Sequence, residues 1–349
     1  MKNFSLIFFI TLIFFLIANI FIVLTWPIYS EYNAKKHSYI KEQKNLLGLS
    51  EQDLVILHNE TWRNFDKFRF VPFLGHSETD RAGKLVNFSE SDGRKVNRPQ
   101  ICDQNIYMYG GSTTFGYNVA DNQTIASYLQ KLVSKNSCVF NHGRAYFYSK
   151  QENNLFINHV ENRKKIDYAI FLDGYNERCG GYEYAKHLNN SFSLLVEKPY
   201  LMWEKSSKNL LHTLPIVQFV NSFVGSGRWI NDGNNNILKI DSCNEKVGLD
   251  KLFETRLSLR KAFCEINGIK CYSFLQPMAG TSGIQSEKLL STEKEIVMKK
   301  KNQLLSNTKG HIDLKYVLND DILLSYVDGA HYSPASNKKI ALELYKFIK

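Results

Sequence analysis

IYMYGGSTTFG, residues 106–116, is the stretch that decides how this 349-residue chain folds. Its first four residues are apolar and typical of a short buried strand, which ends at Gly110 and Gly111. Ser112 then stands where we expect the chain to turn from strand to helix. Glycines there leave room for a substrate, and the backbone N–H groups of the turn point at a developing oxyanion. Glycine-rich turns also bind phosphate or are simply tight, so this motif alone does not make Ser112 a nucleophile.

Short apolar strands of the same kind recur along the chain and alternate with helical stretches, which is typical of parallel β/α units. We predict helices over about 124–132, 249–267 and 336–347. In open α/β sheets, ligands bind outside the carboxyl ends of the strands, so the polar loops that follow the strands should converge on one site. The further strands and their loops are 138–140 with Asn141-His142-Gly143, 168–172 with Asp173-Gly174-Tyr175-Asn176, and 270–275 with Gln276-Pro277.

A second motif, Asp328-Gly329-Ala330-His331, lies in a predicted loop before the last helix. An Asp three residues before a His can place its carboxylate against Nδ1 and leave Nε2 free to take a proton from a serine. An isolated pair of this kind is more often a surface turn. Its place in the chain, after a glycine-flanked serine at the first strand, favours a catalytic interpretation.

Together these motifs resemble the SGNH/GDSL hydrolase family, over residues 104–183 and about 249–349. Four motifs in the family's order are a far more specific signal than any one of them. Glu177 departs from the family, which has Asp at that position, and Gly111 stands where the family's name-giving Asp would be. The four motifs that are similar to the family's blocks are Gly110-Gly111-Ser112, Asn141-His142-Gly143, Gly174-Tyr175-Asn176-Glu177 and Asp328-Gly329-Ala330-His331.

The resemblance implies an α/β fold, a three-layer α/β/α sandwich with a five-stranded parallel sheet of the flavodoxin-like kind, and neither a metal nor a dissociable cofactor. It implies that Ser112 is the nucleophile, His331 its base and Asp328 the group that holds the imidazole. It also implies an oxyanion hole made by the N–H groups of Ser112 and Gly143 and the side chain of Asn176. Such a site is an esterase when water reaches the acyl-enzyme and an O-acyltransferase when an acceptor hydroxyl does.

An uncharged run of mostly Phe, Ile and Leu over residues 4–26 predicts one membrane-spanning helix. At about 1.5 Å per residue it is long enough for the roughly 30 Å hydrocarbon core. A cleaved signal peptide is the alternative, but its apolar region is shorter, and no small-x-small cleavage site follows Leu24. Lysines just beyond the run favour a cytosolic body by the positive-inside rule. A short amino-terminal tail before a hydrophobic span is nevertheless common in signal anchors, so we expect residues 1–30 to be such an anchor and the remainder to be periplasmic or extracytoplasmic.

The rest of the chain is expected to form two parts. Residues 31–103 are predicted to be a membrane-proximal stalk that packs on the main domain, and residues 104–349 to be the hydrolase-like domain. An insertion at about 178–248, which holds Trp203 and Trp229, interrupts the β/α pattern. An anchored enzyme suggests an envelope substrate, and we expect an O-acylated, in particular O-acetylated, polysaccharide or lipid-linked sugar. The alternative from another class is a non-catalytic glycan-binding or assembly protein that uses the insertion.

The charge pattern points away from nucleic acid. The formal charge of +10, from 44 Lys and Arg against 34 Asp and Glu, is scattered in pairs along the chain. No nucleic-acid-binding motif accompanies it, so we expect no nucleic-acid partner. The one basic run, Lys299-Lys300-Lys301, is interpreted as the solvated end of a helix.

The six cysteines include no C-x-x-C pair, which disfavours a zinc site. They are either disulfides formed in an oxidising compartment or ordinary buried thiols. If the body of the chain is extracytoplasmic, we expect every cysteine to be paired. The expected bridges are Cys102–Cys138 near the starts of neighbouring strands, Cys264–Cys271 around a helix-to-strand turn, and Cys179–Cys243 across the insertion.

Overall fold

The computed structural model describes most of the chain as two compact units. One unit contains the described residues 2–36, and the other contains the described residues from 44 onward. The predicted insertion falls almost wholly outside the described residues. The described residues are 2–36, 44–62, 68–69, 71, 73–178, 248–283, 292–320 and 324–349.

The second unit has a mixed α/β fold built on an eight-stranded sheet in the order β10-β9-β8-β6-β7-β5-β4-β3. The strands from β10 to β5 pair in parallel, and β4 and β3 add antiparallel pairs at one edge. The order β7-β6-β8-β9-β10 is the flavodoxin-like, doubly wound one. The strands are β3 Arg81–Ala82, β4 Asn87–Ser89, β5 Gly93–Arg94, β6 Gln104–Gly110, β7 Ser137–Asn141, β8 Tyr168–Asp173, β9 Lys270–Leu275 and β10 Ile312–Asp313.

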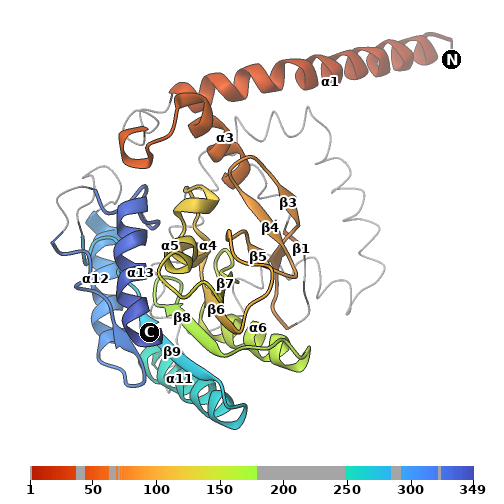
Figure 1. The fold of residues 1–349 in the computed structure, drawn as a ribbon. Coiled ribbons are helices and arrows are strands. Elements are labelled where there is room, and N and C mark those ends of the chain that lie inside the picture. Colours follow the sequence, from red (N-terminus) through yellow and green to blue (C-terminus); the bar gives the residue numbers. More distant parts are fainter. Residues whose placement is uncertain are drawn as a thin grey trace. The chain divides into compact units, whose positions relative to one another are not determined.

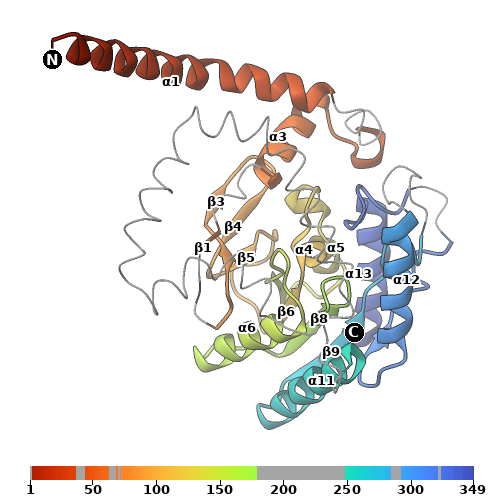
Figure 2. The same ribbon diagram turned by 180° about the vertical axis from the view of Figure 1, so that it is seen from behind.

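Helices lie against both faces of the sheet, which gives three layers (Figures 1 and 2). Because successive side chains of a strand point to opposite faces, β6 serves two apolar clusters. Ile106 and Met108 pack with helices α5 (Ile125–Gln130) and α13 (Pro334–Ile348). Tyr107 and Tyr109 face the other way. They pack with α6 (Ser149–Glu161) and α11 (Leu249–Ile266).

The predicted strands and helices are observed, with bounds that differ by a few residues. The strand predicted at 270–275 is β9, and the helix predicted at 336–347 is α13, which starts two residues earlier with Pro334 in its first turn. A proline there costs nothing, because the first helical N–H groups have no partner within the helix. Ser333 caps this helix through a hydrogen bond from Ser336 N to its side chain.

The region predicted to be a stalk contributes strands to the sheet. β5 pairs with β7 of the main domain, and β4 and β3 follow it to the edge. Arg94 of β5 is fully buried, where it pairs with Asp121 at 2.6 Å and lies over the ring of Phe115. A short antiparallel pair, β1 (Phe68–Arg69) with β2 (Ser77–Glu78), and helix α3 (Glu51–Trp62) complete the region. The described part of this region therefore includes regular strands that extend the sheet of the main domain.

The basic run at 299–301 is not the solvated end of a helix. It lies in the middle of α12 (Thr292–Ser306). Lys301 is 6% exposed, and its Nζ donates to the carbonyl of Tyr175 at 3.0 Å. Burial lowers the pKa of Lys301 to about 8. That side chain therefore supports the loop after β8 instead of facing solvent.

The amino-terminal run is helical, in α1 (Lys2–Lys36). Several of its large apolar side chains are exposed, among them Phe14 at 76% and Leu24 at 68%. No helix meets the length and apolarity required to cross a membrane, within the residues that the structure describes.

Two of the three expected disulfides are confirmed. Cys102–Cys138 and Cys264–Cys271 are bonded, with Cα separations of 5.7 and 6.1 Å. Both values fall in the range of about 4.4–6.8 Å that disulfides require. The first ties the segment before β6 to the start of β7, and the second ties the end of α11 to β9. The third expected bridge, Cys179–Cys243, lies outside the described residues.

Buried histidines next to β6 make the fold sensitive to acid. His142 is 1% exposed, its ring stacks on Tyr107 at 5.0 Å, and its two nitrogens have no hydrogen-bond partner among the described residues. Burial lowers the pKa of His142 well below its usual value, and burial lowers the pKa of the neighbouring His159 to about 3. Below about pH 6.5 the unfolded chain therefore binds protons that the folded chain does not, and stability is lost as the pH falls.

We predict that His142→Phe flattens this acid dependence, because the ring stack is kept and one titrating group is removed. Each such histidine contributes about 1.4 kcal/mol per pH unit below its unfolded pKa. Denaturant unfolding of the parent and the variant between pH 7 and 5 measures how the free energy of unfolding of each protein depends on pH. The parent should lose about 2 kcal/mol more than the variant between pH 6.5 and 5. Parallel pH curves for the two proteins would show that His142 is charged inside the fold.

Candidate active site

Ser112 stands at the turn between β6 and the short helix α4 (Ser112–Phe115), as the sequence predicts. The residue before Ser112 has to be glycine, because other parts of the chain lie too close to it for a side chain. A Cβ on Gly111 would lie 2.5 Å from Nδ2 of Asn176 and 3.2 Å from the carbonyl oxygen of Phe147. The Asp that the resemblance would place at this position has no room, so glycine here and Asn176 after β8 are matched to each other.

The structure brings the three predicted catalytic side chains into one hydrogen-bonded series. His331 Nε2 lies 2.8 Å from Ser112 Oγ, and His331 Nδ1 lies 2.7 Å from Asp328 Oδ2. Both distances are those of normal or short hydrogen bonds. A neutral imidazole that donates from Nδ1 to the carboxylate has its lone pair on Nε2, where it can take the serine proton. Two distant parts of the chain, 219 residues apart, thus meet at the carboxyl end of β6.

Asp328 is held as a carboxylate by its neighbours. Its Oδ1 accepts from the backbone N–H groups of Ala330 and His331, each at 2.8 Å. Burial alone would raise the pKa of Asp328, but the charge and hydrogen bonds of His331 and the bond from Ala330 outweigh it and lower that pKa below its usual value. Asp328 is therefore ionised at neutral pH, the state in which it can orient and stabilise an imidazolium.

Gln276, directly after β9, accepts hydrogen bonds from the residues that follow Ser112 and His331 in the sequence. Its Oε1 accepts from Thr113 Oγ1 at 2.6 Å and from the hydroxyl of Tyr332 at 3.1 Å. Thr113 follows Ser112, the predicted nucleophile, and Tyr332 follows His331, its predicted base. Gln276 is predicted at a strand end, but no signal in the sequence indicates this contact, because a single Gln after a strand matches no motif.

The two oxyanion donors predicted beside Ser112 differ in their surroundings. Asn176 lies against Gly111, and its Nδ2 donates one hydrogen to the carbonyl of Phe147 at 3.0 Å, which leaves it a second hydrogen. The only N–H of Gly143 donates to Asn141 Oδ1 at 3.1 Å. A Cβ on Gly143 would lie 2.3 Å from the backbone nitrogen of Phe115, so this glycine allows the loop after β7 to pack on α4. An oxyanion at Gly143 would have to displace the bond to Asn141.

Glu177, which stands where the family has Asp, binds two other parts of the fold. It is fully buried and accepts from the backbone N and the Oγ of Ser149, at 2.7 and 2.9 Å, and from Arg256 at 3.1 Å. Ser149 is the first residue of α6. The carboxylate therefore joins the loop that carries Asn176 to the start of α6 and to α11.

A clamp formed by Glu78 of β2 and by His76, the residue before that strand, holds the loop between β7 and α6. The side chains of His76 and Glu78 bond the two polar groups of one residue, Ala145. Its carbonyl lies 2.8 Å from His76 Nε2, and its N–H donates to Glu78 Oε1 at 2.8 Å. Glu78 also pairs with Arg144 at 3.7 Å. No pattern in the sequence indicates the clamp, because strands of two residues have no recognisable periodicity.

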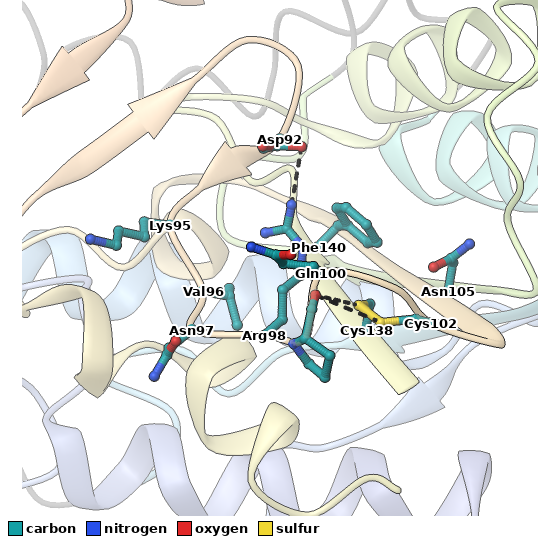
Figure 3. Close-up of a pocket in the computed structure, with 11 residues that line it drawn as sticks. Asp92, Lys95, Val96, Asn97, Arg98, Gln100, Cys102, Asn105, Cys138 and Phe140 are labelled. Carbon is teal, nitrogen blue, oxygen red and sulfur yellow. Dashed lines mark hydrogen bonds and ion pairs between the residues drawn. A yellow bond between two sulfur atoms is a disulfide. The ribbon is translucent and has the colours of Figure 1, made fainter. Parts of the chain in front are cut away.

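A separate hollow of about 450 Å³ lies near the amino-terminal ends of β6 and β7, and Ser112 is not among the residues that line it (Figure 3). It is lined by the Cys102–Cys138 disulfide and by Arg98, which pairs with Asp92 at 3.0 Å and lies 4.1 Å over the ring of Phe140. The Arg98 cation is thus already matched by a carboxylate. The residues that the structure describes contain no cluster of side chains suited to hold a metal ion.

Comparisons with known proteins give structural neighbours only. No family model matches the chain, and no curated protein matches it. The solved structures that it is similar to include a carbohydrate acetylesterase family member from Sinorhizobium meliloti, with 11% identity, TM-score 0.36 and coverage of 70% of this chain and 97% of that one. An aryl esterase of M. smegmatis has 11% identity, TM-score 0.38 and coverage of 70% and 98%. A member of the lipolytic G-D-S-L family from Veillonella parvula has 10% identity, TM-score 0.37 and coverage of 70% and 97%.

These neighbours are esterases and lipolytic proteins. At TM-scores below 0.5 the likeness carries no weight for the function of this chain. The geometry around Ser112 is independent of that likeness and carries the functional conclusion alone.

Proposed function

We propose that this chain is a serine esterase of the SGNH/GDSL kind that works through an acyl-Ser112 intermediate. One observation carries the proposal: Ser112, His331 and Asp328 form a continuous hydrogen-bonded series at the carboxyl end of the sheet, with distances of 2.8 and 2.7 Å. A serine, a base within reach of it and a third group that orients the base are the parts of a nucleophilic site. A non-catalytic glycan-binding protein has no need of this alignment.

The reaction proceeds in two acyl transfers. Ser112 Oγ attacks the ester carbonyl while its proton passes to His331 Nε2, and the bond to the leaving alkoxide breaks as His331 returns that proton to it. Water then attacks the acyl-Ser112 ester in the same way, releasing the carboxylic acid and restoring the serine. The negative charge on the carbonyl oxygen is met by Asn176 Nδ2 and the N–H of Ser112. Gly143 is not part of this oxyanion hole, because its N–H donates to Asn141 Oδ1.

The proposed substrate is an O-acylated, in particular O-acetylated, envelope polysaccharide or lipid-linked sugar. An acceptor hydroxyl in place of water would make the same site an O-acyltransferase, since only the second attacking group differs. The proposal of an envelope substrate rests on the amino-terminal run at 4–26, which is uncharged and apolar. Faster consumption of an acetyl ester on addition of a sugar acceptor, with an acetylated sugar as product, would distinguish transfer from hydrolysis.

We further propose that residues 4–26 anchor the chain and that the site faces the periplasm or the cell exterior. Fusions of phosphatase and of a cytosolic reporter after residue 60 test this. The proposal expects activity from the phosphatase fusion alone. Activity from the cytosolic reporter alone would overturn it.

An active-site burst tests the esterase proposal with the purified protein. With p-nitrophenyl acetate in excess, formation of the acyl-enzyme should release one p-nitrophenol per chain before the slower steady state. A burst that scales with protein concentration supports the covalent intermediate. A folded protein that shows neither burst nor turnover with acetyl, propionyl and butyryl esters would contradict it.

A further inference from the structure

Asp328 of the proposed triad bonds to a further side chain that no sequence motif marks. Asn118 Nδ2 donates to Asp328 Oδ2, the oxygen that also accepts from His331. The two partners are 210 residues apart in the chain, and Asn118 is 4% exposed. Together with the two backbone N–H groups on Oδ1, the carboxylate accepts four hydrogen bonds. A donor on Oδ2 favours the ionised carboxylate and fixes the plane in which it meets the imidazole.

Trp62 determines which way the Asn118 amide faces. The indole Nε1–H of Trp62 donates to Asn118 Oδ1. An indole N–H is only a donor, so the amide oxygen has to face Trp62 and the amide NH₂ has to face Asp328. Without the indole N–H, the amide is able to turn over. It would then place its oxygen against the carboxylate, where two acceptors repel each other.

The backbone at Asn118 and the rings around it support the same role. Asn118 has φ of 62°, in the left-handed region that glycine and asparagine adopt more readily than other residues. The ring of Trp62 makes edge contacts with His331 at 6.0 Å and with Tyr117 at 5.4 Å. Tyr117 in turn stacks on His331 at 5.5 Å. The indole is therefore fixed beside the catalytic imidazole while its N–H holds Asn118.

We propose that Trp62 and Asn118 are positioning residues that keep Asp328 ionised and aligned with His331. The proposal rests on the proposed esterase function and extends its hydrogen-bonded series to five residues, from Trp62 to Ser112. Trp62 is the last residue of α3, in the region expected to be a stalk. A hydrolase-like domain that began at residue 104 would lack it, so the segment before that domain completes the site.

Three variants of the full chain test this, with kcat and KM for an acetyl ester measured beside the thermal unfolding midpoint. Asn118→Gly removes the amide and accepts the positive φ. Loss of a hydrogen bond to a charged group predicts a fall in kcat of about 10- to 100-fold with KM within about twofold. Trp62→Phe keeps an aromatic ring beside His331 and removes the N–H together with the second ring of the indole, which predicts a fall of about 3- to 10-fold. In the double variant, Trp62→Phe should add less than about twofold, because it acts through Asn118.

Leu54→Ala is the matched control. Leu54 is buried on the same helix, two turns before Trp62, and its loss should lower the unfolding midpoint and leave kcat unchanged. Equal effects of Trp62→Phe in the presence and absence of Asn118 would overturn the proposal, as would an Asn118→Gly protein with the parent's kcat. A parent with no esterase activity would instead refute the proposed function, which the burst assay detects before any variant is made.

Discussion

Ser112→Ala should abolish both the p-nitrophenol burst and steady-state turnover, with a fall in kcat of at least about 10⁴-fold. The reason is that the variant lacks the nucleophile that accepts the acyl group. Among the described residues, Ser112 is the hydroxyl within hydrogen-bond reach of His331 Nε2, at 2.8 Å. The change removes one oxygen from a half-buried side chain, so the fold should persist. Burst amplitude, kcat and the unfolding midpoint are measured on the same preparation.

Ser137→Ala is the matched control for this change. Ser137 is buried at the amino end of β7, where its Oγ bonds Gln104 at 3.1 Å, far along the sheet from the turn at Ser112. It should cost stability and leave the burst intact. A folded Ser112→Ala protein with the parent's burst would show that the acylated group lies elsewhere.

Asp328→Asn is expected to lose roughly 10⁴ in kcat with little change in KM, the loss seen when a triad carboxylate is replaced by an amide. In this structure Oδ2 accepts from both His331 Nδ1 and Asn118 Nδ2. An amide NH₂ at that position meets two donors. The imidazole then places its proton on Nε2 and faces Ser112 with a donor, so it is unable to act as a base. Steady-state kinetics and the unfolding midpoint measure the two effects separately.

Asp167→Asn provides the comparison at the other end of β8. The Asp167 carboxylate accepts from the backbone N of Asn105 at 2.7 Å and touches none of the triad. The Asp167→Asn variant should therefore leave kcat unchanged. If Asp328→Asn likewise lowered only the unfolding midpoint, the carboxylate would be structural, and the imidazole would be oriented by other groups.

The parallel strands and the residues of the proposed triad have local signals in the sequence. Each strand from β6 to β9 is an apolar run that ends in a polar loop, and the rule that ligands bind at carboxyl ends brings those loops together. Asp328 and His331 are three residues apart, a spacing at which the carboxylate can reach Nδ1, and the place of the pair after the glycine-flanked serine favours that contact. The contact between Ser112 and His331 needs only the strand order in addition.

The features that the sequence does not predict depend on contacts across long separations. Trp62 and Asn118 are 56 residues apart, and neither lies in a motif. The strands β3 and β5 have two residues each, too few for a period to be seen. Lysine is rarely buried, so the sequence predicts a solvated Lys301, but a carbonyl of the loop after β8 gives its amine a partner. Gly143 matches a family pattern, while the bond from its N–H to Asn141 is visible only in three dimensions.

Covalent labelling with a phosphonofluoridate tests the central claim most directly. Ser112 Oγ should attack phosphorus and expel fluoride, with His331 taking the serine proton. Digestion and mass spectrometry of the labelled full chain should find one phosphonyl group, on the peptide that contains Ser112, and no adduct in Ser112→Ala or after acid unfolding. An unlabelled native protein, or an adduct on another residue that persists in Ser112→Ala, would contradict the account.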